Sequence, residues 1–226
     1  MAGDRGVTPR PAAIATYPTR EAQAAAVADR LAADLARLVA DRGRAVIAVP
    51  GGTTPGPMLT RLGAADIPWA AVTVALTDER RVQEDSPRSN LGLLRRTLLA
   101  GRAAAARVVP LDVDASQAVE AALTPLDIVV LGMGDDMHTA SLFPGAAALG
   151  AALAADAPAV VEIEAPDAGE PRLTLSARLL DAAAARHILI AGPSKRAALD
   201  RALALGDPLQ APILAVLDGA TVHYAD

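Results

Sequence analysis

Residues 45–65 read AVIAVPGGTTPGPMLTRLGAA, which is a short apolar run, a glycine-rich turn and then a helical pattern of apolar residues. A β-branched apolar run favours a strand, and apolar residues recurring at helical spacing favour an amphipathic helix. Further apolar runs stand at residues 72–77, 126–132, 187–192 and 213–218. The alternation of strand and helix patterns predicts an α/β protein.

The predicted strands are almost continuously apolar, rather than alternately apolar and polar. This pattern is typical of strands that are covered on both faces of a parallel sheet. We therefore expect a layered sandwich with a mostly parallel sheet flanked by helices. Helices are predicted at residues 21–41, ending at Gly43, and at 55–65, 90–100 and 194–206, with Ser89 and Ser194 as N-caps. Residues 146–171 are expected to form a helix, an edge strand and a loop.

Composition excludes several classes of protein. The chain has 226 residues and a net charge of -5, and its basic residues are scattered, so we expect no nucleic-acid partner. It has no cysteine, which excludes disulfides and thiolate chemistry. No stretch approaches the roughly 20 uncharged apolar residues of a membrane span. We expect a cytoplasmic protein, a monomer or weak homodimer, with residues 1–226 forming one domain and residues 1–15 a flexible N-terminal segment.

The glycine-rich turn of the opening stretch is a candidate anion site. Gly51, Gly52, Thr53 and Thr54 lie between a predicted strand and a predicted helix. Glycines allow the backbone to approach a ligand, and helix-start N–H groups and threonine hydroxyls can bind a phosphate. A plain strand-to-helix turn explains the same residues. The spacing matches neither the dinucleotide fingerprint nor the Walker loop.

Charged residues follow the next predicted strand, in TDERRV at 77–82. The carboxyl end of a strand in an open parallel sheet is where ligands bind, so Asp78, Glu79, Arg80 and Arg81 are all candidate site residues. Position alone does not select among them, and a solvated turn would look the same. Asn90 lies at a helix start, which capping explains without a ligand. Arg172 and Lys195 each lie beside a predicted strand and could reach a phosphate or face solvent.

The segment LGMGDDMHTASLFPG, residues 131–145, carries the strongest indication of catalysis. It runs from a strand through a glycine turn to His138, with Asp136 two residues before it. A histidine beside a carboxylate can take a proton from water and return it to a leaving group. His187 opens an apolar run and is predicted to be structural, and His223 lies in the C-terminal tail. Because no histidines stand at metal-ligand spacing, we infer no metal.

GGTTP, TDERRV, SN at 89–90, GMGDDMHTASLFPG, PRLTL and GPSK occur in the order and approximate spacing of the 6-phosphogluconolactonase family, which the chain resembles from about residue 15 onward. The resemblance implies the Rossmann-like fold of ribose-5-phosphate isomerase and glucosamine-6-phosphate deaminase. It also implies hydrolysis of 6-phosphoglucono-1,5-lactone to 6-phosphogluconate in the oxidative pentose phosphate pathway, without a cofactor.

The resemblance assigns roles to individual residues. It implies that His138 is the general base and that Asp78 orients water or a sugar hydroxyl in the pocket. The family's cations, which suit the phosphate and the developing charge, match Arg80, Arg172 and Lys195. The loop that cradles the sugar phosphate matches Gly51, Gly52, Thr53 and Thr54. Asn90 and Asp136 are expected to support the site.

The chain departs from the family pattern at two positions. Pro50 replaces a serine, which removes a hydroxyl and a backbone donor. Met137 replaces the glycine before the histidine, and a positive φ there would strain Met137 by about 1 kcal/mol or more.

Two other functions were considered for the same residues. A deaminase or isomerase of this fold would need an acid-base glutamate where this chain has Phe143, and it would release ammonia from glucosamine 6-phosphate. A non-catalytic sugar-phosphate sensor would bind 6-phosphogluconate without accelerating lactone loss, and the first 40-odd residues lack a basic recognition helix.

Overall fold

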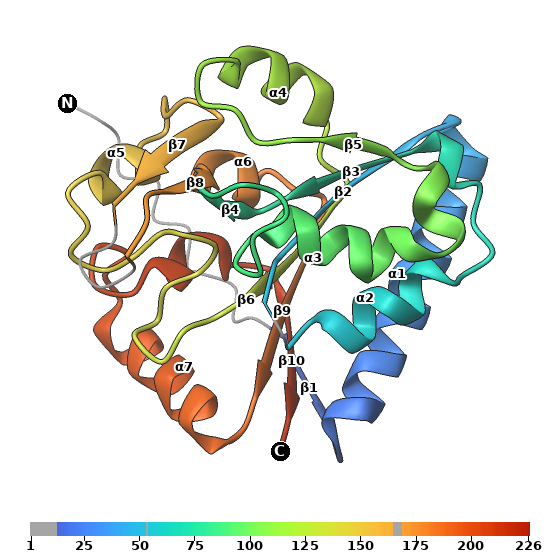
Figure 1. Ribbon diagram of the computed structural model, residues 1–226. Coiled ribbons are helices and arrows are strands. Elements are labelled where there is room, and N and C mark those ends of the chain that lie inside the picture. The colour runs from blue at the N-terminus through green and yellow to red at the C-terminus, as the bar shows by residue number, and fades with distance from the viewer. Residues whose placement is uncertain (1–12, 53, 165–168) are drawn as a thin grey trace.

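The computed structural model describes residues 13–52, 54–164 and 169–226, and these form a layered α/β fold around a central parallel sheet (Figure 1). All neighbouring strands of this sheet pair in parallel. Across the sheet the order is β1 (Ala13–Tyr17), β10 (Thr221–Ala225), β9 (Ala185–Ala191), β6 (Ile128–Gly132), β2 (Ala45–Val49), β3 (Val72–Leu76) and β5 (Arg107–Val109). The predicted fold class is confirmed.

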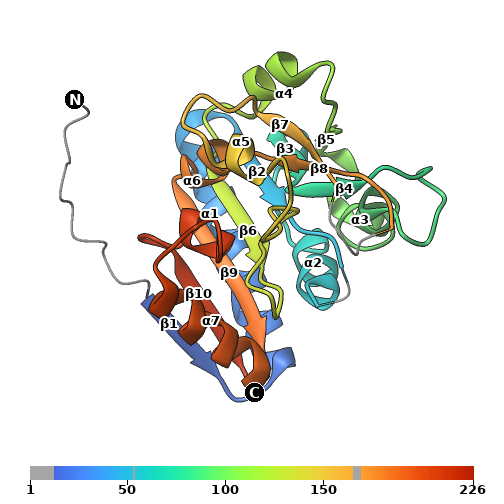
Figure 2. The same ribbon diagram turned by 90° about the vertical axis from the view of Figure 1, so that its left-hand side faces the viewer.

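Helices cover both faces of the sheet (Figures 1 and 2). Within the described residues they are α1 (Arg20–Arg42), α2 (Gly56–Gly63), α3 (Asn90–Arg96), α4 (Ser116–Leu123), α5 (Leu149–Leu153), α6 (Ala177–Asp181) and α7 (Pro193–Leu205), with short 3-10 turns at Trp69–Ala71, Leu98–Ala100, Arg102–Ala105 and Pro212–Val216. One core packs β2 and β3 against α1 and α2, and a second packs β6 and β9 against α6 and α7. Alternate residues of β2 divide between them: Ile47 enters the first and Ala48 the second. Both faces being apolar explains the continuous strand pattern.

The order of the strands places a crevice between β2 and β6. From β2 the chain moves outward through β3 to β5, then returns to β6 on the other side of β2 and continues to β9 and β10. The connections therefore diverge where β2 and β6 lie side by side, at Ile47↔Ile128 and Ala48↔Val129. In open α/β sheets the crevice beyond the carboxyl ends of two such strands is the usual ligand site.

A second, antiparallel sheet flanks that crevice and was not predicted. Its strands are β4 (Asp78–Arg80), β8 (Arg172–Leu175) and β7 (Val160–Ile163), in that order. The TDERRV segment thus leaves the main sheet after β3 and enters a different sheet. Arg80 stands directly opposite Arg172 in this pairing.

Several local predictions were confirmed and several were wrong. Gly43 ends α1 in the left-handed conformation, and Ser89 caps α3 by accepting a bond from the backbone N–H of Gly92 (3.0 Å). Residues 213–218 are not a strand, because they lie mainly in the 3-10 turn that Pro212 begins. Ser194 lies inside α7, whose N-cap is Gly192. Residues 13–15, placed in the flexible segment from sequence, belong to β1, and residues 1–12 lie outside the described part.

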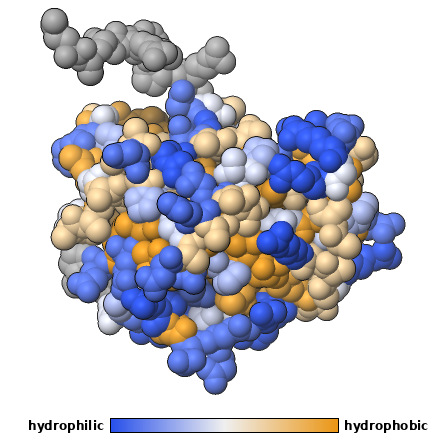
Figure 3. Space-filling model, turned by 90° about the horizontal axis from the view of Figure 1, so that it is seen from above, coloured by the Kyte–Doolittle hydropathy of each residue, from blue (hydrophilic) through white to orange (hydrophobic). Residues whose placement is uncertain are grey.

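The face above α4 mixes hydrophilic residues with small hydrophobic patches (Figure 3). The large apolar side chains exposed in the described residues are Ile14, Leu203, Leu205 and Leu209. In the part of the chain that the structure describes, no helix combines the length and apolar character needed to cross a membrane.

Candidate active site

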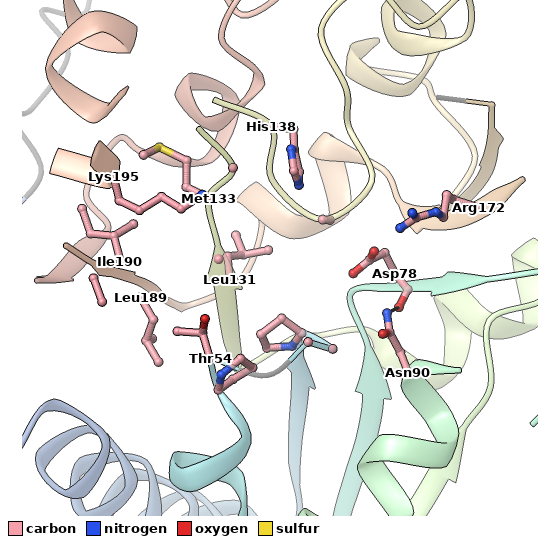
Figure 4. Close-up of a pocket in the computed structure, with 18 of the residues that line it drawn as sticks. Thr54, Asp78, Asn90, Leu131, Met133, His138, Arg172, Leu189, Ile190 and Lys195 are labelled. Atoms are coloured by element: carbon pink, nitrogen blue, oxygen red, sulfur yellow. Dashed lines mark hydrogen bonds between the residues drawn. The ribbon is translucent and has the colours of Figure 1, made fainter. Parts of the chain in front are cut away.

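A cavity of about 520 Å³ opens at the carboxyl ends of β2 and β6, where the topology predicts a ligand site. This volume suits a small-molecule substrate. It brings together residues that are far apart in the sequence (Figure 4). The sequence-predicted residues that line it are Gly51, Gly52, Thr54, Asp78, Arg80, Asn90, His138, Arg172 and Lys195. Thr53 lies outside the described residues, and Asp136 contacts the cavity through His138.

His138 is oriented by Asp136. Its Nδ1 lies 2.6 Å from Asp136 Oδ1, and its backbone N–H donates to the same oxygen (3.2 Å). Burial alone would raise the pKa of the Asp136 carboxyl, but the bond to His138 and the attraction between the two groups leave that pKa below its ordinary value. An ionised carboxylate only accepts, so Nδ1 carries a proton, and in the neutral ring Nε2 then keeps its lone pair. A neutral imidazole in this tautomer can act as a base.

The backbone around His138 is tight and strained. A side chain at Gly134 would overlap His138 Nδ1 and Asp136 Oδ1, so glycine is required there for the pair to form. Met137 has a φ of 68°, which is the left-handed conformation expected for the glycine it replaces. Ala140 also has a positive φ, of 47°. The condition under which Met137 would be strained is therefore met.

Asp78 is held on the far side of the cavity by residues of three segments. It is buried, and its Oδ2 accepts a bond from the Ser141 hydroxyl (2.7 Å) while Oδ1 accepts one from Thr77 (3.2 Å). Asn90 Nδ2 donates to the Asp78 carbonyl oxygen (2.9 Å). Gly51 packs directly on Asn90, because a Cβ at Gly51 would overlap that carboxamide. Asn90 thus helps to position the pocket as well as starting α3.

Arg80 and Arg172 form a cluster of positive charge beside Asp78. They are cross-strand neighbours, and like charges in this position destabilise a sheet. The Nε atoms of both are buried without a hydrogen-bond partner in the described part of the chain. Burial lowers the pKa of Arg172, and the charge of Arg80 lowers it further. Such a pair is suited to an anion that would satisfy both groups.

Lys195 provides a second centre of positive charge, on the opposite side of the cavity from Arg172 (Figure 4). It lies in the first turn of α7, and its Nζ is 3.4 Å from Asp135 Oδ2. Helix N-termini attract anions. The cavity therefore has basic side chains at both sides, with His138 between them (Figure 4).

Three residues of the site were given no role in it by the sequence analysis, which named Phe143 only as the residue that replaces the glutamate of a deaminase. Ser141 was quoted in the HTAS segment without a role, yet it orients Asp78. Phe143 packs on His138, with ring centroids 4.5 Å apart, and Arg172 lies 5.7 Å from the centre of the same ring. Arg20 lines the cavity although it begins α1. The HTASLFPG motif could have indicated the first two, whereas nothing near Arg20 in sequence indicated a site.

The other histidines lie in β9 and β10. His187 is buried in β9, which agrees with the structural role predicted for it, and His223, near the C-terminus, is a buried residue of β10. Among the described residues, no three His, Cys, Asp or Glu side chains are grouped in a way that could hold a metal.

The chain is similar to known enzymes over almost its whole length. The family model described as glucosamine-6-phosphate isomerases/6-phosphogluconolactonase matches residues 18–224. A 6-phosphogluconolactonase of Mesorhizobium japonicum is 48% identical over 217 residues, covering 90% of each chain, and one of Pseudomonas putida is 41% identical over 219 residues, covering 92% of this chain and 90% of that one. The crystal structure of a 6-phosphogluconolactonase from Shewanella baltica superposes with a TM-score of 0.89 at 31% identity, covering 95% of this chain and 98% of that one. The chain therefore belongs to the glucosamine-6-phosphate isomerase/6-phosphogluconolactonase family.

Proposed function

We propose that the chain is a 6-phosphogluconolactonase, which hydrolyses 6-phosphoglucono-1,5-lactone to 6-phosphogluconate in the oxidative pentose phosphate pathway. The relatives named above support this activity. The observation that carries the chemistry is the bond between His138 and Asp136 at a cavity that has basic side chains on both sides. We also propose that it acts in the cytoplasm as a monomer or weak homodimer.

In the proposed mechanism His138 is the catalytic base. Its Nε2 takes a proton from a water molecule while the water oxygen bonds to C1 of the lactone. The tetrahedral intermediate then collapses, the bond from C1 to the ring oxygen breaks, and the imidazolium returns the proton to that oxygen. Asp136 stabilises the imidazolium between these steps, because its carboxylate accepts the hydrogen bond from His138 Nδ1–H throughout.

The two groups of cations are assigned different parts of the substrate. Arg172 lies close to His138, since both contact the Phe143 ring, so it is placed to stabilise the charge that develops on the lactone carbonyl. Arg80 adds its positive charge to that of Arg172. Asp78, oriented by Ser141, is assigned to a water or a sugar hydroxyl. Lys195 lies across the cavity and is assigned to the phosphate, together with Gly51, Gly52, Thr53 and Thr54.

Phe143 is the observation that disfavours deamination. Its phenyl ring occupies the place beside His138 where that reaction would need a carboxylate, and a phenyl ring cannot transfer a proton. Glucosamine 6-phosphate should therefore release no ammonia with this protein.

The proposal is tested by following lactone disappearance with the purified chain. We expect 6-phosphoglucono-1,5-lactone to be hydrolysed well above its spontaneous rate, and unphosphorylated glucono-1,5-lactone to be hydrolysed much less efficiently. A protein that binds 6-phosphogluconate but leaves the spontaneous rate unchanged would contradict the proposal and favour a sensor.

A further inference from the structure

Arg20 lines the active-site cavity, yet the mechanism gives it no role. It is the first residue of α1, and its guanidinium reaches the start of α7: a Cβ placed on Gly192, the N-cap of α7, would lie 3.7 Å from Arg20 Nη2. Lys195 lies in the next turn of the same helix. Arg20 therefore belongs to the Lys195 side of the cavity.

The helix that carries Arg20 is fastened to the wall of the cavity. Gln23 follows Arg20 by three residues and so lies on the same face of α1. Its buried carboxamide donates to the carbonyl oxygens of Ile190 (2.9 Å) and His223 (2.7 Å), which belong to β9 and β10. Ile190 itself lines the cavity. Thr19 caps the helix by accepting a hydrogen bond from Ala22 N–H (3.1 Å). The backbone at Arg20 is therefore held by Thr19 before it and by Gln23 after it.

The charge of Arg20 is placed where it does not stabilise its own helix. A cation in the first turn of a helix opposes the helix dipole, and both Arg20 and Lys195 stand in first turns. Arg20 forms no hydrogen bond or ion pair with another residue in the described ranges 13–52, 54–164 and 169–226. The start of α7 and two cations thus lie on one side of the cavity. A bound dianion would be attracted by all three.

We propose that Arg20 is a substrate-binding residue, which together with Lys195 and the start of α7 holds the phosphate of the sugar lactone. This inference rests on the proposed function, because it uses the same cavity and substrate class. It makes Arg20 a determinant of specificity for phosphorylated over unphosphorylated lactones. Because Arg20 belongs to the Lys195 side of the cavity, opposite Arg172, it contributes to binding and not to the chemical step.

The test compares Arg20→Ala with Arg37→Ala, a substitution on the same helix at an exposed arginine that pairs with Asp34 outside the cavity. For 6-phosphoglucono-1,5-lactone, Arg20→Ala should raise KM about tenfold and leave kcat within about a factor of two, as expected when a ground-state contact is lost. The kinetic parameters for unphosphorylated glucono-1,5-lactone should not change. Arg20→Lys should restore most of the affinity, and Arg37→Ala should match the unsubstituted chain.

A second measurement separates this inference from the proposed function. Inorganic phosphate is titrated into each protein by calorimetry, which requires no turnover. Weaker phosphate binding by Arg20→Ala supports the inference, even if the unsubstituted chain proved to be no lactonase. If Arg20→Ala bound phosphate and phosphorylated lactone as tightly as Arg37→Ala does, the inference would be overturned, while the lactonase assay of the unsubstituted chain would still judge the proposed function. A KM that rose equally for both lactones would also overturn it.

Discussion

The two histidine regions of the molecule differ in every property that decides what an imidazole does. His138 lies in a loop at the cavity, with 31% of its side chain exposed and a carboxylate 2.6 Å from its ring. His187 and His223 lie in regular strands, are buried, and contact each other at 3.0 Å between Nδ1 and Nε2. Tyr17 completes this second group, with its hydroxyl 2.8 Å from His223 Nδ1.

The surroundings of the imidazoles differ between the two regions. At His138 a carboxylate lies within hydrogen-bonding distance of a partly exposed ring. In the buried pair, burial lowers the pKa of His187 and lowers that of His223 to about 4, to which the charges of His187 and Arg30 contribute. Those rings remain neutral hydrogen-bonding groups at neutral pH. The same residue type is therefore assigned to catalysis in one place and to structure in the other, and the neighbouring groups decide which.

The largest effect is expected from His138→Ala. Without the base, the lactonase rate should fall by about two to four orders of magnitude. Stability should change little, because His138 is partly exposed and lies outside the two cores. Initial rates of lactone loss above background, with the melting temperature measured beside them, provide the check.

His223→Leu is the matched substitution for that experiment, since it removes an imidazole that does not line the cavity. It should keep turnover near that of the unsubstituted chain at neutral pH. Full turnover in His138→Ala would show that the base has been misassigned.

The buried pair should make the fold sensitive to acid. Each histidine titrates near 6.5 in the unfolded chain, whereas its pKa in the folded protein is lower. The contribution of the neutral histidines to the free energy of unfolding is therefore complete above about pH 6.5, and it is lost as the pH falls toward their pKa in the folded protein. Because the pKa of His223 in the folded protein is about 4, this residue alone should lower the free energy of unfolding by about 2 kcal/mol between about pH 7.5 and pH 5.

Urea unfolding at the two pH values measures this loss. His223→Leu removes one titrating group, so its free energy of unfolding should depend less steeply on pH, whatever its absolute stability. An equal pH dependence in both proteins would mean that other groups cause it.

Much of the fold could be predicted because the buried strands carry their own signal. The continuous apolar runs of β2, β3, β6 and β9 indicated a sheet covered on both faces. Residues 213–218 carry the same signal, but a short apolar run does not distinguish a strand from a buried helical turn, and Pro212 starts a turn there. The strands that do form this end of the sheet are β1 at the edge and β10 beside it, and they include polar residues such as His223, so they were not recognised.

Some features of the site lie within one short segment of the sequence, and others arise only where distant segments meet. His138 with Asp136, and the glycine turn at 51–52, are local motifs and were recognised. The opposition of Arg80 to Arg172 and the reach of Arg20 to Gly192 arise from pairings between distant segments. A single sequence carries no register for such pairings, so their geometry could not be inferred.

The smallest effect concerns the backbone that distinguishes the two regions. His187 and His223 stand in ordinary strands, whereas His138 follows Met137, whose φ is 68°. Met137 packs partly on the core, so Met137→Ala and Met137→Gly both lose that packing, but only glycine relieves the strain. The glycine variant should therefore be more stable than the alanine variant by about 1 kcal/mol.

The sign of this difference is the test. At an ordinary helical position such as the exposed Ala33 of α1, replacing alanine with glycine should instead cost about 0.5–1 kcal/mol. Chemical unfolding of the two Met137 variants, and of Ala33→Gly beside the unsubstituted chain, measures both differences. If glycine were the less stable choice at 137 as well, the left-handed backbone before His138 would not be strained, and the family's glycine there would need another explanation. Because strain of this kind persists only where the surrounding structure imposes it, the expected reversal would show that the fold holds the His138 loop in its conformation against the preference of Met137.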